Sequence, residues 1–378
     1  MYCFAGSSNW VKINDMKILF YIDTIGFGGA ERVIANLANQ LLSKGCQTLV
    51  ITTFRMEKEY SLDPRVTRYS MDKEYNAPFW KRNAMLLCRL RKVLRMENPD
   101  VAIAFLPESI FRLAIASWGF GITKIYSVRS DPRFVYRTRA YKLLAKLLLP
   151  SASGFVFQTE EAKEFFPPSI KKKSTIIFNQ VAEEFYDVSI PVVRTGIVAT
   201  GRLVPPKDHF LLVDAFELIK DRIGDNLTIY GDGPLRDKLH DYIISKGLQD
   251  RVLLPGSVSS VPNAISSAKV YVLSSNHEGM PNGLMEAMAL GVPCVSTDCP
   301  CGGPKALFGE RQKDLLVPVN DSAALADAIL RVVESEELRS VLSAENKERA
   351  LFFKPDVVLE SWYSFINTVY YGKKGHRV

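Results

Sequence analysis

Short runs of β-branched and aromatic residues alternate with longer amphipathic segments along most of this chain. In the first half, the runs that we predict to be strands are residues 17–23 (KILFYID), 48–54 (TLVITTF), 101–106 (VAIAFL), 124–128 (KIYSV) and 154–158 (GFVFQ). Helical periodicity fills the gaps, and its first segment spans residues 30–44 and stops at Gly45. Short strands separated by helices are typical of parallel sheets, so this half predicts a doubly wound α/β fold.

The alternation restarts after residues 180–195, a mixed segment that lacks periodicity and contains Pro191. The strand-like runs beyond it are residues 196–201 (GIVATG), 226–233 (NLTIYGDG), 251–256 (RVLLPG), 269–275 (KVYVLSS) and 292–297 (VPCVST). We therefore predict a linker there and two Rossmann-like domains, residues 1–190 and 191–354. A last helical pattern, at residues 355–371, could pack on either domain.

Composition adds the class of protein and the compartment. A length of 378 residues suits two domains, and 47% apolar with 24% charged residues is ordinary for a globular chain. No apolar run approaches the ~20 residues of a membrane-spanning helix, and residues 1–15 lack the pattern of a secretory signal. Because a strand-like run begins at Met16, we interpret residues 1–15 as an upstream extension. The six cysteines form no Cys-x-x-Cys pair, which favours reduced thiols in a cytoplasmic protein.

The first half of the chain is basic. Residues 1–190 hold 27 Lys and Arg against 18 Asp and Glu, and residues 79–96 and 133–150 mix leucines with cations at helical spacing. Each of these two segments is either a helix with its apolar stripe in the core, or a surface for anionic lipid or a lipid diphosphate. Two such segments in one domain favour an anionic membrane surface, and no recognition motif supports nucleic acid as a partner.

The first strand ends in a glycine-rich turn, DTIGFGGAER, in which Gly28 and Gly29 open a helix. Such a turn lets the backbone approach an anionic ligand, and many dinucleotide-binding proteins share it. An NAD site would also show an acidic residue at the end of the second strand, where this chain has Thr53 and Phe54. An NAD-dependent oxidoreductase is therefore disfavoured.

The strand at residues 196–201 is followed by GRLVPPKDH, which carries Arg202 and Lys207. Two cations at the carboxyl edge of a sheet suit a diphosphate, although both could also be solvated loop residues. The chain has no Asp-x-Asp pair suited to Mg²⁺ there, so we expect the cations to take the place of a metal. Two further glycine-bearing turns, at residues 230–234 and 253–259, lie at the same edge.

Residues 274–297 read SSNHEGMPNGLMEAMALGVPCVST, and between Gly279 and Thr297 the only charged side chain is Glu286. Pro281 suits the first turn of a helix, so Glu278 lies in the preceding loop and Glu286 within the helix. Burial of a carboxylate without partners is unfavourable, and the hydroxyls of a sugar would supply such partners. The alternative is that Glu286 caps nearby backbone or pairs with Arg202.

Taken in order, these motifs resemble the retaining GT-B glycosyltransferases of family 4, over nearly all of the chain from Met16. The resemblance rests on residues 28–32 (GGAER), 201–203 (GRL) with Lys207, 231–234 (GDGP), and the Glu278/Glu286 pair followed by 287–293 (AMALGVP). It implies two Rossmann-like domains facing across a cleft, a nucleotide-sugar donor held mainly by the second, no metal, and residues 355–378 crossing back to the first.

The resemblance also implies roles for individual residues. Arg202 and Lys207 would hold the donor diphosphate, Glu286 the ribose, and Glu278 with the loop after it the transferred sugar; Arg202, Lys207 and Glu278 would be catalytic. The backbone around residues 255–258 would border the nucleobase. The donor-binding set that it implies is Gly28, Gly29, Arg202, Lys207, Gly231, Gly256, Ser257, Val258, Glu278, Gly279, Met280, Pro281, Asn282, Gly283, Leu284 and Glu286.

Two positions depart from the family pattern. Where many members have a histidine near the sugar, this chain reads Ser127-Val-Arg-Ser-Asp-Pro132, so Arg129 and Asp131 are candidates for the acceptor or sugar side. The glycine that often follows the diphosphate lysine is replaced by Asp208, which could begin the next helix.

These expectations combine into one hypothesis. The chain would transfer a hexose or N-acetylhexosamine with retention, from a UDP-sugar to a lipid-linked glycan or surface-polysaccharide intermediate, as a peripheral protein on the inner face of the cell membrane. Attack would come from the face of the departing phosphate, which takes the acceptor's proton, so we assign no nucleophile. The alternative is a non-catalytic GT-B subunit that binds a nucleotide sugar or a partner glycosyltransferase.

Overall fold

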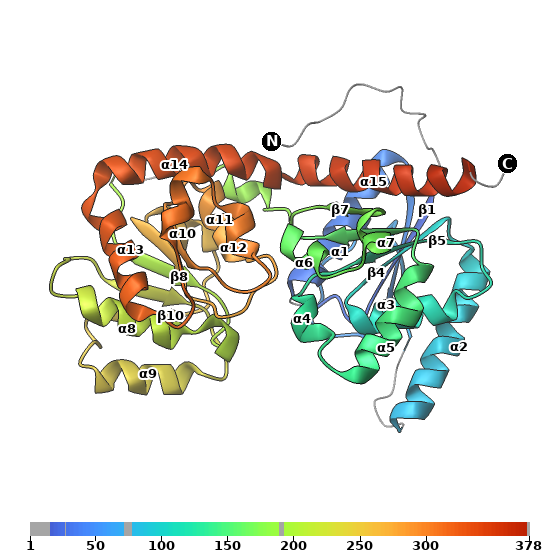
Figure 1. Ribbon diagram of the computed structural model, residues 1–378, viewed down its shortest axis with the longest axis horizontal. Coiled ribbons are helices and arrows are strands. Elements are labelled where there is room, and N and C mark those ends of the chain that lie inside the picture. The colour runs from blue at the N-terminus through green and yellow to red at the C-terminus, as the bar shows by residue number, and fades with distance from the viewer. Residues whose placement is uncertain (1–15, 27, 72–77, 189–192, 376–378) are drawn as a thin grey trace. The chain divides into compact units, whose positions relative to one another are not determined.

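The computed structural model describes residues 16–26, 28–71, 78–188 and 193–375 (Figure 1). The extension expected at residues 1–15 and the centre of the expected linker, including Pro191, lie outside these described residues.

The first sheet has seven strands in the order β3-β2-β1-β4-β5-β6-β7. Parallel pairing joins β1 to β2 and β4, with Leu19 opposite both Leu49 and Ala102. The strands are β1 (Lys17–Ile22), β2 (Gln47–Thr52), β3 (Thr67–Ser70), β4 (Val101–Phe105), β5 (Thr123–Ser127), β6 (Gly154–Phe157) and β7 (Ser174–Ile176). The doubly wound α/β fold predicted for this half is confirmed.

The helices of this half include both of the basic segments. They are α1 (Gly29–Gln40), α2 (Phe79–Glu97), α3 (Pro107–Ala116), α4 (Pro132–Val135), α5 (Arg139–Leu148), α6 (Glu160–Glu164) and α7 (Pro168–Lys171). The helix predicted at residues 30–44 forms as α1, continued by a 3-10 turn, Leu41–Lys44. It ends at Gly45, whose positive φ of 78° is a conformation that glycine adopts without strain.

The second sheet has six strands in the order β10-β9-β8-β11-β12-β13, and each neighbouring pair is parallel. The strands are β8 (Ile197–Thr200), β9 (Leu227–Tyr230), β10 (Val252–Gly256), β11 (Val270–Leu273), β12 (Cys294–Thr297) and β13 (Leu316–Val317). β8 lies between β9 and β11, so the strand order reverses there. Open α/β sheets bind ligands at such a point, outside the carboxyl ends of the strands.

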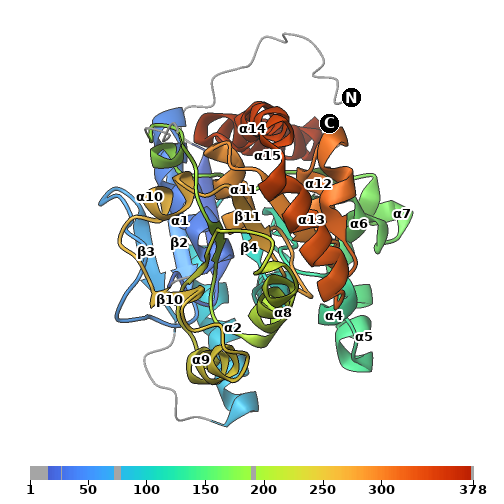
Figure 2. The same ribbon diagram turned by 90° about the vertical axis from the view of Figure 1, so that its left-hand side faces the viewer.

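In the described residues, helices α8 to α15 follow the strands of the second sheet or close the chain, and Figure 2 brings α8, α9 and α13 towards the viewer. They are α8 (His209–Ile219), α9 (Arg236–Ser245), α10 (Val261–Ser266), α11 (Asn282–Ala289), α12 (Gly303–Leu307), α13 (Ser322–Glu334), α14 (Glu336–Ala350) and α15 (Pro355–Gly375). Among the described residues, no helix combines the length and apolar character needed to cross a bilayer.

Residue contacts divide the chain into two compact units. The first holds the described residues up to Ser127, residues 143–155, and those from Tyr363 onward. The second holds residues 128–142 and the described residues of 156–362. The domain boundary at residue 190 stays a prediction.

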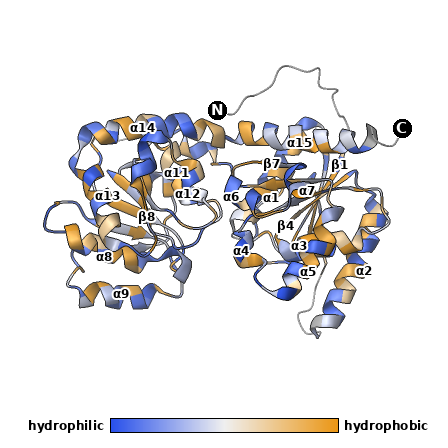
Figure 3. Cartoon of the chain, viewed as in Figure 1, coloured by the Kyte–Doolittle hydropathy of each residue, from blue (hydrophilic) through white to orange (hydrophobic). Residues whose placement is uncertain are grey.

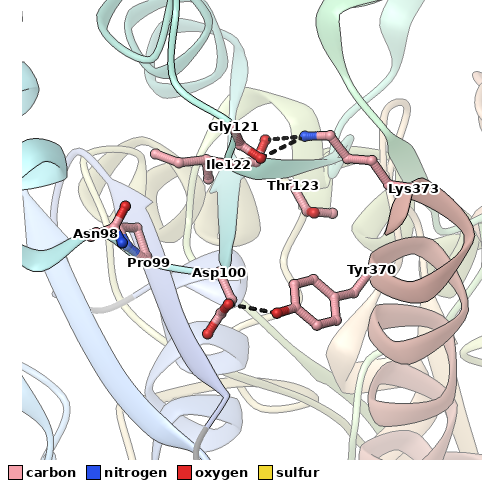
Figure 4. Close-up of a pocket in the computed structure, with 8 residues that line it drawn as sticks. All are labelled: Asn98, Pro99, Asp100, Gly121, Ile122, Thr123, Tyr370 and Lys373. Carbon is pink, nitrogen blue, oxygen red and sulfur yellow. Dashed lines mark hydrogen bonds between the residues drawn. The ribbon is translucent and has the colours of Figure 1, made fainter. Parts of the chain in front are cut away.

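The end of α15 is fastened within the first unit. Tyr370 donates a hydrogen bond of 2.6 Å to Asp100, which precedes β4, and Lys373 donates to the carbonyls of Gly121 and Ile122 before β5 (Figure 4). These residues line a cavity of about 210 Å³ together with Asn98, Pro99 and Thr123. The contacts lie at the amino ends of β4 and β5, the edge opposite to the one where Rossmann-like sheets bind ligands.

Candidate active site

The loop after β8 carries the two predicted diphosphate cations, Arg202 and Lys207. Arg202 is exposed to solvent, whereas Lys207 ends a short 3-10 turn, Pro205–Lys207, and is only partly exposed. The aliphatic stem of Lys207 lies against Gly201, 3.4 Å from where a Cβ of that residue would stand. The loop thus offers one solvated cation and one cation held against the backbone, beside the point where the strand order reverses.

Asp208 begins α8, as predicted. It has a left-handed backbone, with φ of 43°, and its carboxylate accepts a hydrogen bond of 3.4 Å from the Leu211 N–H. The left-handed backbone explains why a glycine would suit this position, and the side-chain cap explains why an aspartate is tolerated.

Lys207 and Glu278 form an ion pair that joins the ends of β8 and β11. Lys207 Nζ donates to Glu278 Oε1, and Ser275 Oγ donates to the same oxygen at 2.9 Å. The two side chains are 24% and 14% exposed, so the pair is shielded but open to a ligand. Two hydrogen bonds hold the same loops together: Ser274 Oγ donates to the Lys207 carbonyl, and the Asn276 N–H donates to the Pro206 carbonyl.

Glu286 lies within α11 and is buried at 8% exposure. The helix packs tightly onto β8 and β11, because a Cβ on Gly283 would stand 2.4 Å from the Tyr271 hydroxyl and 2.8 Å from Thr200 Oγ1. Burial raises the pKa of the Tyr271 phenol, and the charge of Glu286 adds to that rise. Glycine at position 283 therefore brings the carboxylate-bearing helix onto the sheet.

The loop before α11 is equally crowded. A Cβ on Gly279 would meet the Arg129 carbonyl at 2.7 Å, and the Gly279 carbonyl lies 2.1 Å from where a Cβ of Gly303 would stand. Met280 and Pro281 are buried, and Leu284 of the first helical turn is fully enclosed. The backbone from Gly279 to Gly283 is thus fixed by its neighbours.

The glycine turns after β9 and β10 let neighbouring strand ends approach one another. A Cβ on Gly231 would stand 1.9 Å from the Gly201 carbonyl, and the Gly231 N–H donates to the Gly256 carbonyl at 2.9 Å. Ser257 is exposed and Val258 is half-buried. Arg236, which the sequence did not single out, donates to the Leu254 carbonyl at 2.9 Å and so steadies the β10 turn.

Arg129 is buried and connects to the start of α11 through Asn179. Arg129 Nη1 donates to Asn179 Oδ1 at 2.7 Å, and Asn179 Nδ2 donates to Asn282 Oδ1 at 2.7 Å. Burial lowers the pKa of the Arg129 guanidinium to about 9, and this group lies 5.5 Å from the ring centre of Trp362. The structure thereby links a residue predicted for the acceptor or sugar side with the predicted donor loop.

Asp131 begins α4 and also faces the donor loop. Its carboxylate accepts from the Arg133 N–H at 2.9 Å, and its second oxygen lies 3.7 Å from His277 Nε2. Phe134 packs edge-on against the His277 ring at a centroid distance of 5.3 Å. His277 and Asn179 were not predicted as site residues from the sequence. Asn179 could have been, because it is a polar residue shortly after the end of β7.

Gly28 and Gly29 lie in the first unit, where Gly28 precedes the first turn of α1. A Cβ on Gly28 would meet the Glu31 carboxylate at 2.1 Å, and that flexible side chain could move aside. The other predicted donor-binding residues lie in the second unit.

Comparison with known families agrees with this arrangement. Residues 194–335 match the family model for glycosyl transferases group 1, and residues 27–184 match the model for glycosyltransferase family 4. The chain belongs to the family 4 glycosyltransferases. The structure of this glycosyltransferase is also similar to that of the Anabaena protein Alr3699/HepE, which was solved in complex with UDP and has the GT-B fold. The superposition covers 93% of this chain and 100% of the Anabaena chain, with a TM-score of 0.79 and 19% sequence identity.

Two curated relatives illustrate the range of this similarity. The exopolysaccharide phosphotransferase SCO2592 of Streptomyces coelicolor is 27% identical over 92% of this chain, which spans 40% of that protein's length. A Campylobacter jejuni α-1,4-N-acetyl-D-galactosaminyltransferase, named for a GalNAc-containing diphospho-undecaprenol acceptor, is 27% identical over 94% of this chain and 99% of its own.

Proposed function

We propose that this glycosyltransferase moves a hexose or N-acetylhexosamine, with retention of configuration, from a UDP-sugar to a lipid-linked glycan or surface-polysaccharide intermediate. One observation carries the proposal: Lys207 and Glu278 meet where the strand order of the second sheet reverses, with Arg202 on the same loop as Lys207. The acceptor named for the Campylobacter relative supports the lipid-linked class. Binding of UDP by the Anabaena protein supports the choice of nucleotide.

In this proposal the cations act on the leaving group. Arg202 offers a planar fork of donors to the diphosphate, and Lys207 a compact charge. When the bond to the sugar breaks, negative charge grows on the diphosphate, and these two cations stabilise it without a metal. A phosphate oxygen takes the acceptor's proton, so no side chain serves as nucleophile or general base.

The carboxylates hold the groups on either side of the diphosphate. Glu286 accepts from the ribose hydroxyls, and Glu278 with the loop amides from Gly279 to Gly283 positions the transferred sugar. When the donor binds, Lys207 and Glu278 separate. Lys207 then contacts the diphosphate and Glu278 the transferred sugar, so neither side chain is left without a partner. Arg129 and Asp131 serve the acceptor or sugar side.

We place the reaction at the inner face of the cell membrane, with the protein bound to an anionic bilayer surface through its basic first half. The excess of Lys and Arg over residues 1–190 supports this location.

A donor screen tests the proposal directly. Thermal-shift measurements with UDP-, GDP- and ADP-sugars identify the donor, and transfer of the radiolabelled sugar to lipid acceptors then follows. Stabilisation by UDP-sugars, with transfer or slow hydrolysis that persists in EDTA, is the expected result. Binding of a UDP-sugar without transfer or hydrolysis under any condition would favour the alternative, a non-catalytic subunit.

A further inference from the structure

The structure separates two basic amphipathic segments that look alike in sequence. In α2, Leu86, Leu90 and Leu94 are buried at 1% exposure or less, so its apolar stripe belongs to the protein core. In α5, none of the ten residues is buried. Leu143 and Leu147 are 58% and 65% exposed, and Leu144 is 36% exposed.

The side chains of α5 are sorted around the helix. At about 100° of rotation per residue, Leu143, Leu147 and Leu144 fall within an arc of about 100°. Arg139, Lys142 and Lys146 lie together on the adjoining arc, and all three are exposed. The better-covered positions Tyr141, Ala145 and Leu148 share a third arc. The helix therefore rests on the protein by that third side and presents leucines and cations outward. Figure 3 shows that α5 carries both hydrophobic and hydrophilic residues.

From the geometry we infer that α5 is the surface by which this protein binds an anionic phospholipid bilayer. Leucines beside a row of lysine and arginine match the boundary between acyl chains and anionic headgroups, into which amphipathic helices insert one face. The membrane as a partner is already part of the proposed function, on which this inference rests. The inference adds that α5 makes the contact and that α2 does not.

Charge decides between a bilayer and a second copy of the chain. Residues 132–150 contain five cations, Arg133, Arg137, Arg139, Lys142 and Lys146, and no Asp or Glu. In a two-fold symmetric pair through α5, the same cations would face one another across the contact and repel. An anionic headgroup layer complements them, and their aliphatic stems can lie along the leucine face.

Sedimentation of the full-length protein with vesicles tests the inference. Vesicles of phosphatidylcholine alone are compared with vesicles that also contain phosphatidylglycerol. Binding to the anionic vesicles that weakens as salt is added is the expected result. Leu143→Gln/Leu147→Gln should lower the partition coefficient by about tenfold for each leucine. Lys142→Gln/Lys146→Gln should lower it by about fivefold for each cation.

Matched variants control for general effects of polarity and charge. Leu218 and Ile244 are 58% and 50% exposed on other helices, so Leu218→Gln/Ile244→Gln removes similar apolar surface elsewhere. Lys92→Gln/Arg95→Gln removes two exposed cations from α2. Both control pairs should bind vesicles like the wild type.

Three outcomes would overturn the inference: equal binding to neutral and anionic vesicles, binding that survives the α5 changes, or an equal loss in the control pairs. Self-association abolished by the leucine changes, without vesicle binding, would identify a second copy as the partner instead. Hydrolysis of the donor in solution, measured on the same α5 variants, should stay unchanged. If transfer and hydrolysis are both absent while α5-dependent vesicle binding is present, the proposed function fails and the membrane surface stands.

Discussion

Substitutions in the ion pair between Lys207 and Glu278 should change the stability of the protein and its transferase activity in different ways. Both side chains are mostly shielded, and Ser275 also donates to the Glu278 carboxylate. Lys207→Met removes the cation and leaves a partly buried carboxylate without its charge partner. Exposed pairs contribute roughly 0.2–1 kcal/mol, and removal of one partner from a fully buried pair costs about 3–5 kcal/mol. For this intermediate case we expect a loss of about 2 kcal/mol in the free energy of unfolding.

The second change completes a double-mutant cycle. Glu278→Gln keeps an acceptor for Ser275 and removes the negative charge. In Lys207→Met/Glu278→Gln no uncompensated charge remains, so we expect the two stability losses to be less than additive by about 1–2 kcal/mol. The assay is the thermal midpoint of each variant, in which a loss of about 2 kcal/mol corresponds to about 4–8 °C.

Activity should follow a different pattern. In the proposed mechanism each side chain contacts the donor in the transition state. Each single change should therefore lower kcat by about 10²–10³-fold, and the double variant should recover stability but no activity. The reasoning is refuted if the double variant regains transfer along with its thermal midpoint. It is also refuted if Lys207→Met lowers kcat by less than about threefold.

Three further predictions concern the backbone and the pH dependence of the second unit. Gly283→Ala should cost about 1–3 kcal/mol, since its Cβ would stand 2.4 Å from the Tyr271 hydroxyl, and Tyr271→Phe in the same chain should recover part of the loss in urea unfolding. Asp208→Ala should lower the free energy of unfolding by about 1–2 kcal/mol, because alanine cannot cap α8 and is strained at a φ of 43°. Asp208→Gly should remain within about 0.5 kcal/mol of wild type, and equal losses in the two variants would contradict this explanation. Burial lowers the pKa of His209 to about 4, so the unfolded chain binds its proton first as the pH falls. The free energy of unfolding should therefore be highest above about pH 6.5 and fall by up to about 3 kcal/mol as the pH is lowered towards 4. The thermal midpoint of His209→Gln should vary less with pH over that range.

The sequence predicted the central strands of both sheets and the residues that follow them, because strand-end positions depend on local patterns of apolar, glycine and polar residues. It missed three short edge strands, β3, β7 and β13. The middle of each sheet was therefore predictable, and the loops that bear Arg202, Lys207 and Glu278 could be placed at one sheet edge. The left-handed position at Asp208 was foreseen only as a helix start, since its backbone angle depends on the turn before it.

Other features depended on contacts between residues far apart in the chain. The hydrogen bonds from Arg129 through Asn179 to Asn282 link three segments, and no periodicity shows which polar side chains will meet. The segments that became α2 and α5 have similar composition, yet only α2 buries its leucines. Burial is set by what packs against a helix, which a local pattern does not contain.

The most direct measurement is a calorimetric titration of UDP into the wild-type protein and into Arg202→Ala/Lys207→Met, with uridine as the control ligand. The account predicts that UDP binds the wild type and that its affinity falls by at least about 100-fold in the variant, since two charge-assisted contacts to the diphosphate are lost. Uridine, which has no diphosphate, should bind both proteins alike. UDP binding of equal strength in wild type and variant would contradict the claim that these two cations hold the diphosphate.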